Sequence, residues 1–249
     1  MLLKRPEEIE KMRASGQLVA RIIRTLAESI EPGKSTPKSL DALAERLILE
    51  AGAVPSFKNY RGYPASACIS VNEQVIHGIP DDRPIVEGDI VDIDIGVILD
   101  GWHGDSAWTF PIGEVSDEDR RLLAVTRESL FQGIAKAKVG NRIGDIASAI
   151  QRYVEQNGFS IVRELVGHGI GKQLHEAPSV PNFGRPGTGE RLVEGMTICI
   201  EPMVNAGTHR CKTLDDGWTV VTADGKKSAH FEHMVAIRRS GPEILTLEP

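Results

Sequence analysis

The chain has 249 residues, of which 41% are hydrophobic and 26% are charged, so it is a globular protein with room for one large domain or two small ones. A net charge of −6 without any basic run excludes the electrostatic footprint of a nucleic-acid or membrane-surface binder, and we expect neither partner. No apolar run approaches the roughly 18 residues of a membrane span, and the first residues contain no apolar signal segment. The three cysteines, Cys68, Cys199 and Cys211, lack CxxC spacing, which is typical of reduced thiols in the cytoplasm.

Hydrophobic periodicity and capping residues predict a series of helices. The first runs from Pro6 to about residue 30, and the second follows an N-cap at Thr36 and ends at Gly52. Ser116 caps a third helix over about 117–137, and a fourth covers 145–157. Short strands are expected near 68–80, 90–99, 102–110, 161–166, 197–203, 210–221 and 230–238, with a loop rich in Pro and Gly before about residue 190.

The segment GDIVDIDIGVILDGWHGDSAWTF predicts a β-hairpin that carries acidic residues. Asp100-Gly101 is a strong signal for a two-residue turn, and with this turn Gly96 pairs with Asp105. Asp94 and Asp105 then lie on one face as diagonal neighbours, with Cα atoms about 7–8 Å apart. Two such carboxylates repel each other unless a cation lies between them or one of them is protonated. A solvated polar face is the alternative, and the hairpin alone does not decide between the two.

A repeat runs through the chain. The string VEGDIVDID at 86–94 matches VEGMTICIE at 193–201, acid on acid, and a similar shift lays the helix that ends at Gly52 over the one that ends at Gly158. We therefore expect an internally duplicated α+β fold with pseudo-two-fold symmetry. It would form one catalytic domain over 1–249, with repeats of about 1–112 and 113–249. Chance similarity over nine residues is the alternative.

Three further segments carry residues that are typical of metal ligands. His168 lies between glycines in GHGIG, Glu201 ends an apolar strand before a proline, and Glu232 lies within a strand expected over 229–237. Together with the hairpin acids they favour a pair of divalent first-row ions over a structural zinc site. Two ions about 3.5–4 Å apart share one water and lower its pKa, so the expected chemistry is metal-assisted hydrolysis. A phosphatase or nuclease would also want Arg or Lys clamps, which these motifs lack.

The motifs HGDSAWTF, GHGIG, IEPM and FEH, together with NYRGYPASACISVNEQVIHGIPDD and LHEAPSVPNFG, resemble those of the type I methionine aminopeptidases over essentially the whole chain. The resemblance implies the pita-bread fold, with a central antiparallel sheet covered by helices. It also implies removal of the initiator methionine from nascent chains with a small second residue, by attack of a metal-bridging water or hydroxide. Two alternatives stay open: a proline-specific peptidase of the same fold, and a pita-bread module that binds peptides without catalysis.

The resemblance implies a role for each matching residue. Asp94 would hold one ion, Asp105 and Glu232 would bridge both ions, and His168 and Glu201 would hold the other. Glu201 would also shuttle the proton. His77 and His175 would contact the scissile amide and the developing oxyanion, and the methionine pocket would be lined by Phe57, Tyr60, Tyr63, Cys68 and Trp218.

Two positions depart from the family pattern. Leu174 stands where relatives often have Phe, so we expect a wider pocket rim, and Gly96 stands where some relatives carry Thr. The remaining histidines fit structural roles: His103 would support the hairpin turn, and His209, His230 and His233 would be surface or packing residues.

The expected cofactors are two divalent ions, and Co, Mn and Fe(II) all suit a site rich in oxygen ligands. Asn72 and Ser228 match positions that hold a monovalent cation in relatives. The implied partners are the N-termini of nascent polypeptides, with the ribosome as a further candidate, and we expect a monomer in the cytoplasm.

Overall fold

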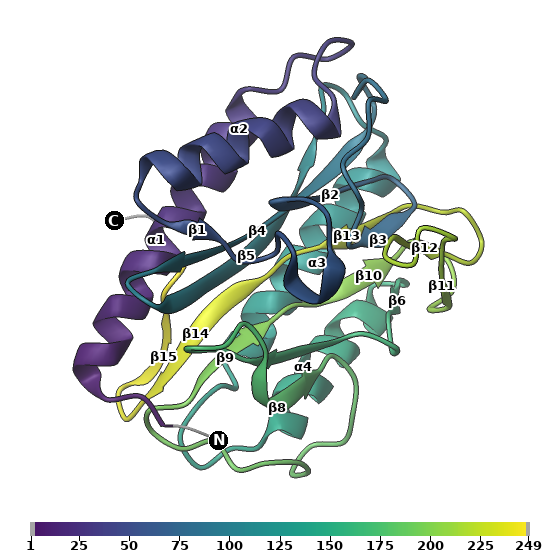
Figure 1. Cartoon of the computed structure of the whole chain (residues 1–249). Coiled ribbons are helices and arrows are strands. Elements are labelled where there is room, and N and C mark those ends of the chain that lie inside the picture. The colour runs from purple at the N-terminus through teal and green to yellow at the C-terminus, as the bar shows by residue number, and fades with distance from the viewer. Residues whose placement is uncertain (1–2, 248–249) are drawn as a thin grey trace.

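The computed structural model describes residues 3–247, and Figure 1 shows the course of the chain through them. The α-helices are α1 (Pro6–Glu28), α2 (Pro37–Glu50), α3 (Asp117–Ile134) and α4 (Ile143–Gln156). The strands before α3 are β1 (Val54–Pro55), β2 (Ala67–Val71), β3 (Gln74–Ile76), β4 (Ile90–Leu99) and β5 (Trp102–Pro111), and a 3₁₀ turn, η1 (Tyr60–Gly62), separates β1 from β2. The strands after α4 are β6 (Ser160–Ile161), β7 (Val166–Gly169), β8 (Glu176–Pro181), β9 (Thr197–Ile200), β10 (Met203–Asn205), β11 (Cys211–Thr213), β12 (Val220–Thr222), β13 (Ser228–His230), β14 (His233–Arg238) and β15 (Gly241–Ile244).

Helices α2 and α3 begin at the predicted capping residues. The Thr36 hydroxyl accepts a hydrogen bond from the backbone N–H of Ser39, and Pro37 takes the first helical position, where its missing N–H costs nothing. Ser116 caps α3 by accepting from the N–H of Asp119. The predicted helices are confirmed, although α3 ends at Ile134 rather than near residue 137.

The predicted hairpin is confirmed residue by residue. Asp100 and Gly101 have φ values of 51° and 77°, so both turn residues are left-handed, as a type I′ turn requires. Gly96 lies opposite Asp105, and Asp94 lies opposite Ala107. The two acids therefore share one face of β4 and β5.

Two main antiparallel sheets carry the fold. In the first, β4 pairs with β1, β2 and β5, and in the second the strand order is β15-β14-β9-β7-β8. Helices α1 and α2 lie along the first sheet, while α3 and α4 pack together on the other half of the molecule (Figure 1). The α+β class, with antiparallel sheets covered by helices, is confirmed.

Several expected strands are interrupted or displaced. The strand expected over 161–166 is wrong, because β6 ends at Ile161 and β7 begins at Val166. The strand expected over 210–221 is two strands, β11 and β12, and the expected loop before residue 190 contains β8. The placement of Glu232 inside a strand is also wrong, because it lies in the break between β13 and β14. Such breaks depend on pairing with distant strands, which local sequence does not specify.

The strand pairing repeats between the two halves. Val54 of β1 pairs with Ile98 of β4, and Ser160 of β6 pairs with Asn205 of β10. The second pair lies 106–107 residues after the first, close to the offset of the sequence repeat. This recurrence of register is what an internal duplication produces. The division near residue 112 stays a prediction.

The two halves meet along β5. The hydroxyls of Ser106 and Thr109 donate hydrogen bonds to the carbonyls of Glu232 and His230, at 2.6 and 2.8 Å, and the N–H of Glu232 donates to the carbonyl of Ala107. Each half has its own apolar core, and a third apolar cluster fills the space between the halves. This seam holds side chains of both halves close together.

Candidate metal centre and active site

A cavity of about 200 Å³ opens at the seam between the two halves. Acidic and imidazole groups line its floor, and aromatic and apolar side chains line its walls. The cavity contains every residue that the resemblance assigned to the metal site or the substrate site: Asp94, Asp105, His168, Glu201, Glu232, His77, His175, Phe57, Tyr60, Tyr63, Cys68 and Trp218. Their convergence in one cavity agrees with the sequence interpretation, and their individual roles stay predictions.

The acids reach the cavity from separate segments of the chain. Asp94 and Asp105 project from the hairpin of the first half, and Glu201 follows β9 directly before Pro202, where its carbonyl accepts a hydrogen bond from Asn182. Glu232 is held against β5 by the seam hydrogen bonds described above. Backbone contacts on both sides of the seam therefore fix the positions of the carboxylates.

The carboxylates are buried and lack partners. Each of the acids at the floor is at most 8% exposed, and Asp94 Oδ1, Asp105 Oδ1 and Glu232 Oε1 accept no hydrogen bond from the described residues. Burial, opposed by His230, raises the pKa of Asp94 to about 7. Burial and the neighbouring carboxylates raise the pKa of Glu201 well above its usual value. Removing such groups from water without compensation is costly, so the cluster requires a cation or protons.

His168 presents an unprotonated nitrogen to these acids. Its Nδ1–H donates a hydrogen bond to the carbonyl of Gly169 at 2.9 Å, which leaves the lone pair of Nε2 as the free group of the neutral ring. Nε2 lies 3.8 Å from Asp105 Oδ2 and 3.5 Å from Glu201 Oε1. Burial and the nearby His175 lower the pKa of His168 to about 3, which favours the neutral ring. A lone pair that faces carboxylate oxygens is the arrangement that a metal ion stabilises.

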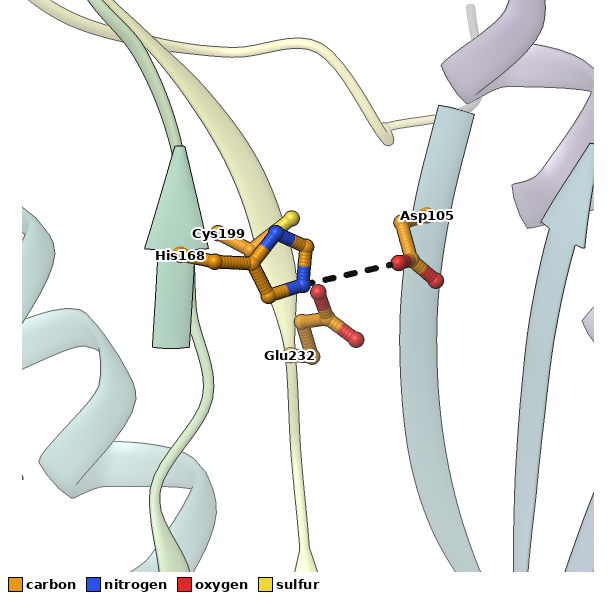
Figure 2. Close-up of side chains that lie close together, drawn as sticks. All are labelled: Asp105, His168, Cys199 and Glu232. Atoms are coloured by element: carbon orange, nitrogen blue, oxygen red, sulfur yellow. Dashed lines mark ion pairs between the residues drawn. The ribbon is translucent and has the colours of Figure 1, made fainter. Parts of the chain in front are cut away.

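Figure 2 shows the tightest group of possible ligands, with Asp105 on one side and His168, Cys199 and Glu232 on the other. One ligand atom of each residue lies within 4.8 Å of the others. The carboxylates and the imidazole of this group suit a divalent metal ion, and the unpaired carboxylate oxygens would balance its charge. Burial raises the pKa of the Cys199 thiol, which disfavours the thiolate that would bind metal.

The family model for metallopeptidase family M24 matches residues 10–239. The chain belongs to metallopeptidase family M24. This M24 chain is therefore a hydrolase that uses divalent metal. A methionine aminopeptidase from Clostridium perfringens is 56% identical over 247 residues, which cover 99% of each chain.

The fold of the M24 chain agrees with solved structures. The crystal structure of methionine aminopeptidase from Thermotoga maritima superposes with a TM-score of 0.97 at 44% identity and covers all of both chains. The prolidase from Pyrococcus horikoshii superposes with a TM-score of 0.80 at 21% identity, over 99% of this chain and 64% of the prolidase. The second likeness shows only the shared fold. Among residues 3–247 of the M24 chain, no helix has the length and apolar character that a membrane span requires.

The aromatic wall of the M24 cavity contacts the histidine of its acidic floor. The Tyr60 ring stacks on His175 with centroids 5.3 Å apart, and the His175 ring lies 4.2 Å from the His168 ring. On the opposite side the ring of Trp218 makes edge contacts with Tyr63 at 5.2 Å and with His77 at 6.2 Å. Each of the two predicted substrate histidines is thus held by an aromatic residue of the pocket.

The structure explains one departure from the family pattern. A Cβ atom at Gly96 would lie 2.5 Å from the Phe57 ring and 2.9 Å from Ser56 Cβ, so the missing side chain admits Phe57 to the cavity wall. Leu174 also lines the cavity, where it is almost fully buried.

Two residues of the M24 centre were missed in the sequence. His230 is 2% exposed and not on the surface: its Nδ1 lies 3.4 Å from Asp92 and its Nε2 lies 3.8 Å from Glu201. Burial opposes its charge, but Asp92 and nearby acids outweigh burial and raise its pKa to about 9. Cys199 joins the group in Figure 2. The available signal was spacing, because each lies two residues before a site acid and so on the same face of an extended chain.

The structure bears on two further expectations, the packing role of His233 and the cation site at Asn72 and Ser228. His233 packs between the rings of Trp108 and Phe131, as a packing residue should. Asn72 and Ser228 are joined by a backbone hydrogen bond outside the cavity, so the monovalent cation stays a prediction.

Proposed function

We propose that this chain removes the N-terminal methionine from nascent polypeptides whose second residue is small. One observation carries the proposal: a buried group of acids with unpaired oxygens forms the floor of a cavity whose walls are largely aromatic and apolar. The acids suit divalent metal, and the walls suit a flexible, polarizable thioether.

The proposed ligands are Asp94, Asp105, His168, Glu201 and Glu232. We propose that they would hold two divalent ions of the Co, Mn or Fe(II) type, and the unpaired oxygens of Asp94, Asp105 and Glu232 support this. Bound there, divalent ions would supply an activated water and would polarise the scissile carbonyl. Glu201 is the proposed group that takes a proton from the attacking water and returns it to the leaving amine.

His175 is the proposed donor to the developing oxyanion. The Tyr60 hydroxyl lies 2.9 Å from His175 Nδ1, and when it donates its proton there, the neutral ring carries its own proton on Nε2. Burial and the charge of Arg61 lower the pKa of His175, which favours this neutral form. His77 is the proposed contact to the scissile amide; burial and the charges of His230 and His175 lower its pKa to about 4.

The proposed setting is the cytoplasm, where nascent chains emerge. Its support is the free state of Cys68, Cys199 and Cys211. We further propose that the enzyme works as a monomer on N-termini presented near the ribosome, as a single domain with the pseudo-repeats described above.

The test is release of free methionine from a Met-Ala-Ser peptide by metal-stripped protein with and without added Mn²⁺, Fe²⁺ or Co²⁺. We expect turnover only with added metal, strong preference over Met-Leu-Ser, and no cleavage of Xaa-Pro dipeptides. Glu201→Gln should abolish turnover, while Glu194→Gln, an exposed acid paired with Arg239, should not. Full activity of Glu201→Gln, or equal rates on both tripeptides, would refute the proposal.

A further inference from the structure

Arg61 lies at the rim of the cavity, where its charge lowers the pKa of His175, but the proposed mechanism gives it no contact with the substrate. Its side chain is exposed, and it is the one Lys or Arg side chain that lines the cavity. Within residues 3–247 no carboxylate forms an ion pair with it. The cation therefore faces the entrance without a partner of opposite charge.

The backbone around Arg61 directs its side chain. Asn59, Arg61 and Gly62 all have positive φ, at 67°, 50° and 92°, and the loop is closed by a hydrogen bond from Asn59 N–H to the Tyr63 carbonyl. A left-handed conformation is uncommon for an arginine and persists only where the surroundings enforce it. The closed loop thus holds the start of the side chain at the entrance.

A short series of contacts relates Arg61 to the reacting centre. Arg61 Cζ lies 5.3 Å from the centroid of the Tyr60 ring, which stacks on His175 at 5.3 Å, and His175 lies 4.2 Å from His168. An extended peptide advances about 3.4 Å per residue. A substrate peptide that runs from the scissile bond past His175 therefore reaches the Arg61 guanidinium with the few residues that follow the scissile bond.

We propose that Arg61 is a specificity-determining residue that binds an acidic side chain at the third or fourth position of the substrate polypeptide. This inference rests on the proposed function. A guanidinium is the side chain best suited to bind a carboxylate through paired hydrogen bonds. Leu165 and Val166, which also line the cavity, offer no competing charge. Deeper in the cavity the buried acids disfavour an acidic side chain, so the preference begins where Arg61 lies.

The experiment measures kcat/KM on C-terminally amidated peptides that begin Met-Ala. The third residue is Glu, Gln or Lys in one series and Ser in a second series, in which the fourth residue varies in the same way. We expect the Glu peptide of at least one series to exceed the Lys peptide by about two- to five-fold, as for an exposed ion pair. Arg61→Gln should remove this difference, and Arg61→Lys should keep part of it. About 1 M salt should reduce it, because the Debye length falls to about 3 Å.

Lys58→Gln is the matched control. Lys58 lies in the same segment, is paired with Glu45 and does not line the cavity, so its loss should leave the preference intact. A preference that survives in Arg61→Gln, or equal rates on all charges in the unmodified protein, overturns the inference and leaves the proposed function standing. A uniform loss on every peptide in Arg61→Gln also overturns it, because Arg61 would then act only as a cover for Tyr60. No turnover of any peptide by the unmodified protein with metal refutes the proposed function itself.

Discussion

At the scale of single residues, His175 joins the aromatic wall of the cavity to its acidic floor. Its ring contacts both Tyr60 and His168. We expect His175→Ala to lower kcat by about 10²–10³, because a donor aimed at developing charge contributes that much in other hydrolases. Steady-state kinetics on Met-Ala-Ser, with metal content measured in parallel, checks this prediction.

The Tyr60→Phe variant distinguishes the contribution of the Tyr60 hydroxyl from that of its ring. It retains the stacking on His175 but removes the contact at Nδ1, so we expect a loss in kcat well below that of His175→Ala. An unchanged kcat in His175→Ala with normal metal content would remove this residue from the mechanism.

Residues beside the predicted ligands were the hardest to find. His230 and Cys199 do not stand out in the sequence, because an isolated histidine or cysteine is more often a packing residue. His230 belongs to the site because its ring nitrogens lie 3.8 Å from Glu201 and 3.4 Å from Asp92. Cys199 belongs to it because its sulfur lies near Asp105, His168 and Glu232. Arg61 was missed for the same reason, since only the folded loop brings it to the cavity.

At the scale of elements, the β4–β5 hairpin fixes the relation between Asp94 and Asp105. Its turn requires two consecutive left-handed residues, and Gly101 supplies one at φ 77°. We expect Gly101→Ala to lower the free energy of unfolding by about 1–2 kcal/mol, because a Cβ atom is unfavourable in that conformation. Urea denaturation monitored by circular dichroism measures the change.

Asp100→Asn is the control for the turn. Asn tolerates the left-handed conformation as Asp does, so this exposed change should alter the stability by less than about 0.5 kcal/mol. Equal stability of Gly101→Ala and the unmodified protein would show that the turn does not determine the hairpin.

At the scale of the whole molecule, the seam between the halves carries the acidic cluster and makes stability depend on both metal and pH. Burial raises the pKa of Asp94 to about 7, so in metal-free protein this group favours the folded state below its unfolded pKa and loses that contribution as the pH rises through about 7. A bound cation removes the cost of the charged form. Metal should therefore stabilise the protein more at pH 8 than at pH 5.

Thermal unfolding of stripped protein with and without Mn²⁺ at the two pH values tests this prediction. At one fixed Mn²⁺ concentration, about 100 times the dissociation constant at pH 8, we expect a gain of about 2.7 kcal/mol at pH 8 and a smaller gain at pH 5. Asp94→Asn should reduce the loss of stability of the stripped protein between pH 5 and pH 8. An equal gain from metal at pH 5 and pH 8 would contradict the assignment of the buried charge.

The sequence by itself determined what depends on neighbours along the chain. Thr36 and Pro37 define a helix start, and Asp100-Gly101 defines a turn and with it the whole register of β4 and β5. These features follow from dihedral preferences and from hydrogen bonds that span only a few residues. The repeat at 86–94 and 193–201 also predicted that Asp94 and Glu201, the aligned acids of the two halves, lie at one site.

Only the tertiary structure decided how the strands break and which side chains surround the acids. Glu232 lies in a gap between β13 and β14. Its carbonyl accepts a hydrogen bond from the Ser106 hydroxyl and its N–H donates one to the Ala107 carbonyl, and both residues belong to β5, more than a hundred residues earlier. His230 enters the site through equally distant contacts, with Asp92 and Thr109. Such contacts are set by packing across the seam, where burial and charge are shared among segments that no local pattern connects.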